Sequence, residues 1–276
     1  TGKWMLKSSR EKDFQNMLKY VSVYFPNTVI DLPPITYTER YTDMPAEVVE
    51  KYREVKAGIK AQVDAGETTI YNALSRDSKL LQLASGVMYS GEGPDRHVVF
   101  QNAFKADLLL DILENEIEEG AACIVWFNYR HSLDLVEQIL EKLGISYLSV
   151  HGGTRNVDEV LKEFESNPGI RILLATNVIS EGQTILKPTY CIKFDHNFQW
   201  LPDFQRTGRN YRQGQTKPVI VIDLVSPGTV EERAFLALRE KEDRCKEILE
   251  GLRMEDWAIE IGGYYGTAPF DDPRAA

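Results

Sequence analysis

The hydrophobic pattern of this 276-residue chain changes near residue 100. Before that point, apolar positions recur mainly at helical spacing, and prolines and turn residues separate the segments. These patterns predict helices over residues 11–24, 45–60 and 69–84 and, after Pro33 and Pro34, an edge strand over residues 35–41. The turn-rich stretch over residues 90–95 is typical of the tip of a short hairpin.

From residue 102 onward, short apolar runs alternate with amphipathic stretches. The runs predict strands over residues 122–127, 147–150, 170–176, 190–194 and 219–225. The stretches between and around them predict helices over residues 106–118, 132–143, 157–165, 202–212 and 229–252. Strands buried on both faces and separated by helices indicate an α/β fold, a parallel sheet with helices on both faces. We therefore expect three regions, over residues 1–100, 101–252 and 253–276.

Composition and charge exclude several classes of protein. No run approaches the length of about 18 apolar residues that a membrane span needs, and no signal peptide is present, so we expect a cytoplasmic protein. Cys123, Cys191 and Cys245 lie far apart, which supports neither a disulfide framework nor a metal site. The net charge of -10 argues against indiscriminate nucleic-acid binding but permits a local basic face. Because the chain starts with Thr1 rather than Met, we expect an excised fragment.

One stretch, F-Q-R-T-G-R-N-Y-R-Q-G-Q over residues 204–215, carries the clearest chemistry. Gln205, Arg209 and Arg212 stand at i, i+4 and i+7, which places them on one face of a helix that would stop at Gly214 and Gln215. Paired guanidinium groups grip phosphate oxygens, so this face favours a polyphosphate or nucleic-acid partner. The alternative is an ordinary solvated surface.

Polar loops follow the predicted strands, where a parallel α/β fold binds its ligands. They cover residues 128–131, 151–154, 177–184 and 195–202. In the second loop, the glycines allow close backbone approach and Thr154 could cap the helix that begins near residue 157. The small and polar residues after Thr176 suit contact with a phosphate backbone or a ribose. Asp195, at the end of a strand, could equally cap a helix or take part in catalysis.

In order and spacing, these segments resemble the second RecA-like lobe of superfamily 2 helicases, and in particular the Swi/Snf-type DNA translocases. The matching segments are motif IV at 124–129, the loop at 150–154, motif V at 174–182, the F-D-x-x-W-N segment at 194–199, motif VI at 205–215 and the helix start G-T-V-E-E at 228–232. Residues 31–34 and 79–86 resemble the helical insertion and inter-lobe linker, in the shortened form of phage and bacterial members.

This sequence departs from the family pattern in three of the segments. In motif V, Ile179 and Ser180 replace a glycine pair, and His151 replaces an aspartate in the second loop. Phe198 and Gln199 stand where the family has Trp and Asn. These departures affect backbone contacts but leave the arginines of motif VI in place.

The resemblance implies the second lobe of an ATP-dependent DNA helicase or translocase. By that resemblance, Arg212 is the arginine finger, Arg209 is its phosphate-contacting partner, and Gln205, Glu181 and Gly182 bind ATP or couple its hydrolysis to motion. The residues implied to contact the sugar-phosphate backbone of DNA, in duplex form, are Asn128, Gly152, Thr154, Thr176, Phe198 and Gln199.

The sequence has neither a phosphate-binding loop of the form G-x-x-x-x-G-K-[ST] nor a D-E-x-H or D-E-A-D run. We therefore expect ATP and Mg²⁺ to be bound mainly by a separate N-terminal RecA-like lobe, and this chain alone not to hydrolyse ATP. Two alternatives stay open. One is a lobe of an RNA helicase, because Gln205-x-x-Gly208-Arg209-x-x-Arg212 fits that branch too. The other is a non-catalytic nucleic-acid-binding module.

Overall fold

The structure is a computed structural model that describes residues 32–64, 70–90, 97–179 and 183–250. Within these ranges, Leu32–Arg239 forms one compact unit, and the described part of the other unit is the end of the last helix. The helix predicted over residues 11–24 and the tail over residues 253–276 lie outside the described residues.

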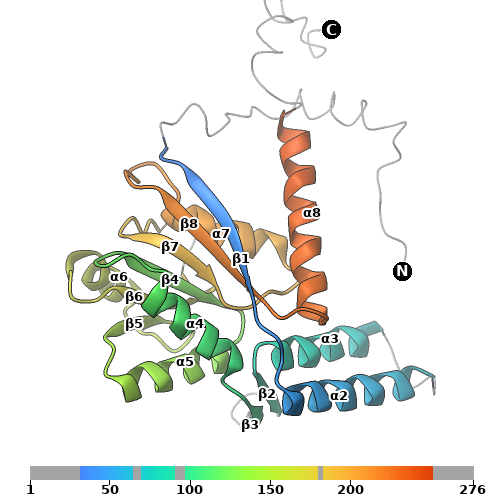
Figure 1. The fold of residues 1–276 in the computed structure, drawn as a ribbon. Helices are drawn as coiled ribbons and strands as arrows, with labels where there is room; N and C mark the ends of the chain where they lie inside the picture. Colours follow the sequence, from blue (N-terminus) through green and yellow to red (C-terminus); the bar gives the residue numbers. More distant parts are fainter. Residues whose placement is uncertain (1–31, 65–69, 91–96, 180–182, 251–276) are drawn as a thin grey trace, which may run out of the picture. The chain divides into compact units, whose positions relative to one another are not determined.

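Six parallel strands form a single sheet in the order β1-β8-β7-β4-β6-β5 (Figure 1). They are β1 (Ile35–Tyr41), β4 (Ala122–Phe127), β5 (Tyr147–Val150), β6 (Ile172–Thr176), β7 (Pro188–Lys193) and β8 (Val219–Val225). Because every neighbouring pair is parallel, the carboxyl ends of all six strands lie at one edge of the sheet. The predicted α/β fold is confirmed.

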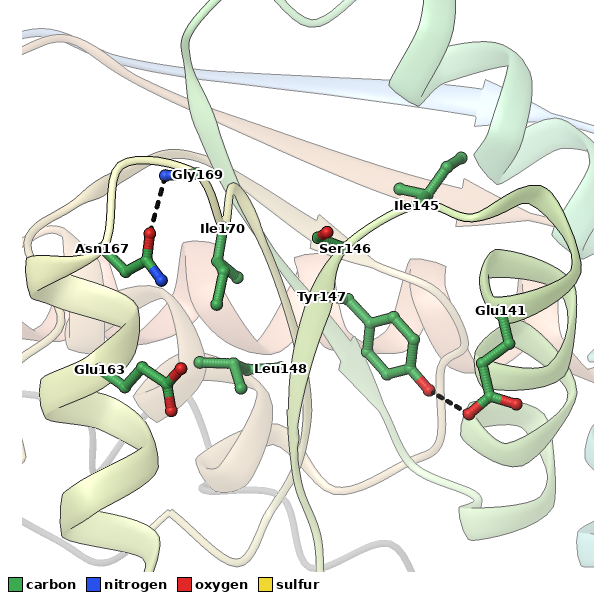
Figure 2. A pocket seen from close by; sticks show the side chains of 9 residues that line it. All are labelled: Glu141, Ile145, Ser146, Tyr147, Leu148, Glu163, Asn167, Gly169 and Ile170. Atoms are coloured by element: carbon green, nitrogen blue, oxygen red, sulfur yellow. Dashed lines mark hydrogen bonds between the residues drawn. The ribbon is translucent and has the colours of Figure 1, made fainter.

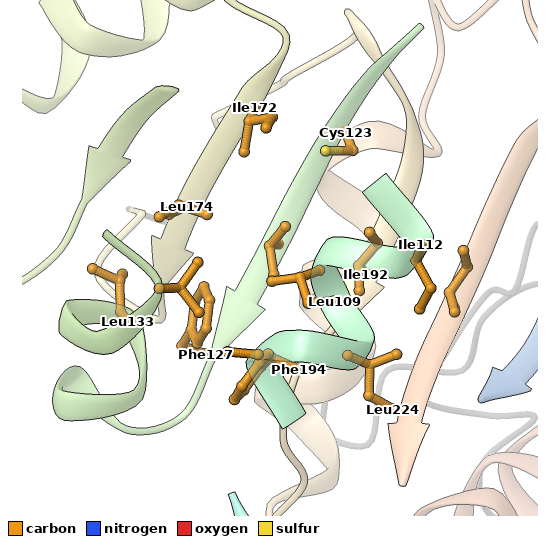
Figure 3. Close-up of a cluster of buried hydrophobic side chains, with 14 of the residues drawn as sticks. Leu109, Ile112, Cys123, Phe127, Leu133, Ile172, Leu174, Ile192, Phe194 and Leu224 are labelled. Atoms are coloured by element: carbon orange, nitrogen blue, oxygen red, sulfur yellow. The ribbon is translucent and has the colours of Figure 1, made fainter. Parts of the chain in front are cut away.

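Helices cover both faces of this sheet. They are α4 (Phe104–Asn115) and α5 (Arg130–Leu143) on one face, and α6 (Val157–Ser166) and α7 (Trp200–Asn210) on the other (Figure 1). Strand β4 is buried throughout and alternates between the two layers. Phe127 packs with Leu109 and Leu133 on one face (Figure 3). Trp126 packs with Phe164 on the other face. This double burial explains why the strand has no polar position.

The N-terminal part contains two helices and a hairpin, α2 (Ala46–Asp64), α3 (Ile70–Ala84), β2 (Val87–Ser90) and β3 (His97–Gln101). A third apolar cluster joins them to α8 (Val230–Glu250), with Tyr52, Leu83 and Ala234 among its buried members. The antiparallel strands of the predicted hairpin are thus present, and its tip lies outside the described residues.

Strand β1 differs from the expected division at residue 100. Residues 35–41 were expected in a region separate from the α/β domain, but β1 pairs with β8 along its whole length. Arg40 also binds Glu116, beyond α4, with its Nε 2.8 Å from Oε1. The reason is that an edge strand joins a sheet through backbone hydrogen bonds, which its side-chain pattern does not reveal.

A buried ion pair joins the first turns of α4 and α8. Lys105 Nζ lies 2.5 Å from Glu231 Oε1, and both side chains are fully buried. The two carboxylate oxygens also accept backbone hydrogen bonds from His196, at 3.2 Å, and Ser226, at 3.0 Å. Glu231 therefore holds together α4, the segment after β7 and the segment after β8.

We predict that Lys105→Met lowers the free energy of unfolding by about 3 to 5 kcal/mol, because it leaves the Glu231 carboxylate buried without its cation. The double variant Lys105→Met, Glu231→Gln should recover much of this loss, because the amide oxygen still accepts a backbone hydrogen bond and the charge is gone. Urea unfolding of both variants checks this. If Lys105→Met lowers the free energy of unfolding by less than about 1 kcal/mol, the stabilising role given to the Lys105–Glu231 pair is wrong.

Candidate ATP and nucleic-acid site

At the carboxyl edge of the sheet, the loops after β4 and β7 are held together by Asn128. Its backbone N–H donates to Asp195 Oδ1 at 2.6 Å, and its Nδ2 donates to the Asp195 carbonyl at 2.7 Å. Asn197 Nδ2 donates to Asn128 Oδ1 at 2.8 Å. Burial raises the pKa of Asp195, although the hydrogen bond from the Asn128 backbone and the charge of Lys105 act in the opposite direction. Asn128 therefore uses its backbone N–H and its side chain for hydrogen bonds within the protein, and these bonds hold the two loops together.

Arg206 connects helix α7 to the same loops. Its guanidinium donates to Asn128 Oδ1 and Asn177 Oδ1, each at 2.8 Å, and to the Phe127 carbonyl at 3.3 Å. The residue is only 2% exposed. Arg206 thus links the segment resembling motif VI to those resembling motifs IV and V.

The helix that carries Gln205 and Arg209 is shorter than predicted. α7 ends at Asn210, and Tyr211 leaves helical geometry with φ -98° and ψ 79°. The prediction that Arg212 shares one helical face with Gln205 and Arg209 is wrong, because Arg212 begins a turn instead. In that turn Gln215 N–H donates to the Arg212 carbonyl at 2.9 Å.

Side-chain hydrogen bonds explain why the helix stops there. Gln215 Nε2 donates to the carbonyls of Asn210, at 3.1 Å, and Leu186, at 2.9 Å, and so satisfies an acceptor at the end of the helix. Tyr211 Oη donates to the Pro33 carbonyl at 3.0 Å. Gly214 adopts φ +104°, a conformation that favours glycine.

The predicted ATP-contacting residues differ in exposure. Gln205 and Arg209 are half-buried on α7, and Arg212 is exposed in the turn, with its Nη1 3.5 Å from Thr184 Oγ1. The Arg209 carbonyl accepts a hydrogen bond from Ile185 N–H at 2.9 Å, which ties the end of α7 to the segment before β7. Glu181 and Gly182 lie outside the described residues.

The residues predicted to contact nucleic acid fall into two groups. Gly152, Phe198 and Gln199 are exposed at the carboxyl edge, and Phe198 keeps 42% of its surface accessible. The Thr176 hydroxyl is instead buried. Thr154 does not cap α6 as expected: its Oγ1 accepts the His151 N–H at 3.0 Å and closes the preceding turn. The helix begins after Asn156, whose side chain makes no capping hydrogen bond.

Residues 104–214 match the helicase conserved C-terminal domain. Among curated proteins, the chain is 26% identical over 208 residues to the SNF2 domain-containing protein ENL1 of Oryza sativa subsp. japonica, which covers 74% of this chain and 20% of that protein. It is 33% identical over 134 residues to Protein CHROMATIN REMODELING 24 of Arabidopsis thaliana, covering 48% of this chain and 12% of that protein. The chain thus spans a quarter or less of these relatives. The chain is therefore similar to SNF2-type proteins, and residues 104–214 resemble a C-terminal helicase domain.

Solved structures share the fold of this chain. The Sulfolobus solfataricus SWI2/SNF2 ATPase core in complex with dsDNA superposes with a TM-score of 0.61 at 24% identity, covering 87% of this chain and 52% of that chain. The C-terminal part of the Fun30 ATPase domain superposes with a TM-score of 0.60 at 16% identity, covering 75% of this chain and 90% of that chain. The expected phage or bacterial type is not supported, because the relatives come from plants, yeast and mouse and the solved SWI2/SNF2 ATPase comes from Sulfolobus.

Sequence patterns did not predict two ion pairs that lie within or beside the sheet. Lys193, in the apolar strand β7, pairs with Asp203 of α7 at 2.6 Å. Arg239 of α8 pairs with Asp223 of β8 at 2.8 Å. A lysine inside an otherwise apolar strand was the available signal for the first pair. Nothing in the sequence marked Arg206 as buried, because it occupies an unspecified position between Gln205 and Arg209.

Burial sets the ionisation of this charged cluster. Burial lowers the pKa of Lys193, but the charges of Asp203 and Asp223 outweigh it, so the net shift is upward. Burial raises the pKa of Asp223 to about 6, against the opposing charges of Lys193 and Arg239. His196, beside Asp223, is neutral because burial and the charge of Lys105 hold its pKa well below the usual value.

A cavity of about 680 Å³ lies away from these residues, beside edge strand β5 (Figure 2). Two carboxylates, Glu141 and Glu163, line it, and Tyr147 Oη donates to Glu141 Oε1 at 2.9 Å. Negative charge of this kind disfavours a polyanion such as DNA or ATP. Across the described ranges, no group of three or more His, Cys, Asp or Glu residues could hold a metal ion, and no helix there is long and apolar enough to cross a membrane.

We predict that the effect of Asp223→Asn on the free energy of unfolding depends on pH, because the buried Asp223 carboxylate destabilises the folded protein when it is ionised. The folded-state pKa of Asp223 is raised from 3.8 to about 6, so the wild-type protein loses stability as pH rises through this window. The free energy of unfolding of the variant relative to wild type should therefore increase by about 2 kcal/mol between about pH 4 and about pH 7.

Urea unfolding at both pH values measures the change. Asp107→Asn, which alters an exposed carboxylate of α4, is the matched control. If the Asp223→Asn difference falls or stays constant as pH rises, the carboxylate does not carry the assigned penalty.

Proposed function

We propose that this lobe completes the ATP site of a DNA translocase and supplies Arg209 and Arg212 to the nucleotide phosphates. The observation that carries the proposal is the arrangement of the motif VI segment: Arg209 at the end of α7 and Arg212 in the exposed turn beyond it. The match of residues 104–214 to the helicase conserved C-terminal domain supports it.

The guanidinium groups suit an ATP-Mg²⁺ ligand because they remain charged and donate several hydrogen bonds to phosphate oxygens. When bound, ATP supplies the γ-phosphoryl group, and charge accumulates on its oxygens during transfer. In our proposal Arg212 stabilises that charge and Arg209 contacts the phosphates. Gln205 lies on the same helix, where it can couple the position of α7 to the nucleotide. A separate N-terminal RecA-like lobe would hold most of the ATP and the Mg²⁺.

DNA contact is proposed for the exposed residues at the carboxyl edge of the sheet. Gly152 lies in a turn where nothing meets an added Cβ within 4 Å, so a phosphate backbone can approach the main chain. Phe198 and Gln199 offer an exposed aromatic ring and an amide. Contacts of this kind to sugar and phosphate carry no sequence information, as translocation along any duplex requires. The solved Sulfolobus solfataricus SWI2/SNF2 ATPase core in complex with dsDNA supports this choice of partner.

We predict that Arg212→Ala, in the two-lobed parent protein, reduces DNA-stimulated ATP turnover by about 10³-fold or more, because the finger acts mainly on the transition state. ATP binding should weaken only modestly. Steady-state turnover with saturating duplex DNA, together with equilibrium ATP binding, measures the two effects.

Lys217→Ala is the matched control, since Lys217 is an exposed cation in the following loop and lies outside the proposed contacts. An unchanged turnover number for Arg212→Ala would overturn the finger assignment. Stimulation by RNA in place of duplex DNA would favour the RNA helicase alternative. A parent protein that binds duplex DNA without any ATP turnover would favour a non-catalytic module.

A further inference from the structure

A cavity of about 250 Å³ lies between the carboxyl ends of β4 and β6 and helix α7. Trp126, Asn177 and Arg206 line its polar side, Gln205 and Arg209 also border it, and Ile179 contributes to its apolar wall. A water molecule occupies about 30 Å³ in the liquid, so the cavity has room for a small polyatomic ligand together with some water.

Two buried donors in this lining have no hydrogen-bond partner among the described residues. They are Trp126 Nε1 and Arg206 Nη1, on residues that are each 2% exposed. Neither an indole nor a guanidinium can accept a hydrogen bond, so each of these groups needs an acceptor. A buried donor left without an acceptor costs about 1 to 3 kcal/mol, and more when it is charged.

The charge of Arg206 is also poorly compensated. All its hydrogen bonds go to neutral acceptors, namely the Asn128 and Asn177 side chains and the Phe127 carbonyl, and none of the ion pairs between described residues includes it. Burial lowers the pKa of Arg206, and the more distant charges of Asp203 and Asp195 oppose this shift only in part. Asp195 Oδ1 accepts a hydrogen bond from the Asn128 backbone, and neither Asp195 oxygen accepts a hydrogen bond from Arg206. A buried cation of this kind is stabilised by an anion.

We propose that this cavity is an oxyanion-binding site that takes a phosphate group. The phosphate oxygens accept hydrogen bonds from Trp126 Nε1 and Arg206 Nη1, and the Arg209 side chain adds positive charge at the border of the cavity. The proposal goes beyond ATP hydrolysis, because it rests on the unsatisfied donors and would hold for a lobe that turns over no nucleotide. Inorganic phosphate, the phosphates of ATP and the phosphodiester of DNA share the required chemistry.

The Trp126 indole N–H provides a direct readout. We would record the ¹H–¹⁵N indole resonances of the full chain during separate titrations with inorganic phosphate, ATP and a short DNA duplex, at constant ionic strength set with chloride. The resonance that disappears in Trp126→Phe identifies Trp126. We expect this resonance to shift and saturate with at least one of the three ligands, with a Kd of about 1 mM or below for the ligand that binds.

Two variants and two matched controls test the donors by equilibrium dialysis with the same ligand. Arg206→Gln should raise its Kd by at least about tenfold, because it removes the buried charge. Trp126→Phe should raise it by about three- to tenfold while keeping an aromatic ring in the core. Trp200→Phe and Arg155→Gln, which change the same residue types outside the cavity, should leave Kd within about twofold.

The ligand that saturates the resonance identifies the source of the phosphate. A Trp126 resonance that none of the three ligands moves at about 50 mM phosphate groups overturns the proposal and indicates that ordered water fills the cavity. An unchanged Kd in Trp126→Phe overturns it as well, and this variant keeps the test decisive if Arg206→Gln does not fold. ATP turnover plays no part in these readouts, so they are independent of the finger assignment.

Discussion

The structure depends on placing charged side chains in the interior at the carboxyl edge of a parallel sheet. Burying an ion without a partner costs several kcal/mol, so each of these groups must meet an opposite charge or several hydrogen-bonding groups. Lys105 meets Glu231, Lys193 meets Asp203, and Asp223 meets Arg239. The first pair joins α4 to α8, the second joins α7 to β7, and the third joins α8 to β8. Apolar packing alone would bind the same layers but would specify their relative positions less closely.

The same interior polar groups organise the loops proposed to act on ATP and DNA. Asn128 and Arg206 form hydrogen bonds that hold three loops and one helix in register. A functional loop that is anchored by its own first residue needs little further ordering when a ligand arrives. Asn128, the first residue after β4, has this anchoring role in the structure, whereas Phe198 and Gln199 lie beyond the anchored part and face solvent.

Sequence patterns predicted the sheet well because its inner strands are buried on both faces. The strands β4, β5 and β8 have the predicted bounds, since their mainly apolar runs are short and are bounded by polar or turn residues. The end of α7 was predicted two residues too late, because the hydrogen bonds that stop it come from Gln215 and Tyr211, which belong to later positions in the chain. Residue spacing likewise did not predict that Lys105 and Arg206 are buried, because a charged side chain is expected to be exposed unless its partner is known.

Because α7 ends between Arg209 and Arg212, these two neighbouring arginines lie in different surroundings. Arg209 belongs to a helix clamped by Arg206 and Asn210 and is half-buried, so its side chain has few rotamers left to lose. The exposed Arg212 side chain must give up about 2 kcal/mol of rotamer entropy to hold one geometry. Its backbone, by contrast, is fixed on both sides, by Tyr211 bound to Pro33 and by the turn that closes at Gln215. Arg212 therefore presents an exposed side chain from a backbone that is held in place, so its guanidinium can be repositioned by side-chain rotation alone, without a shift of α7.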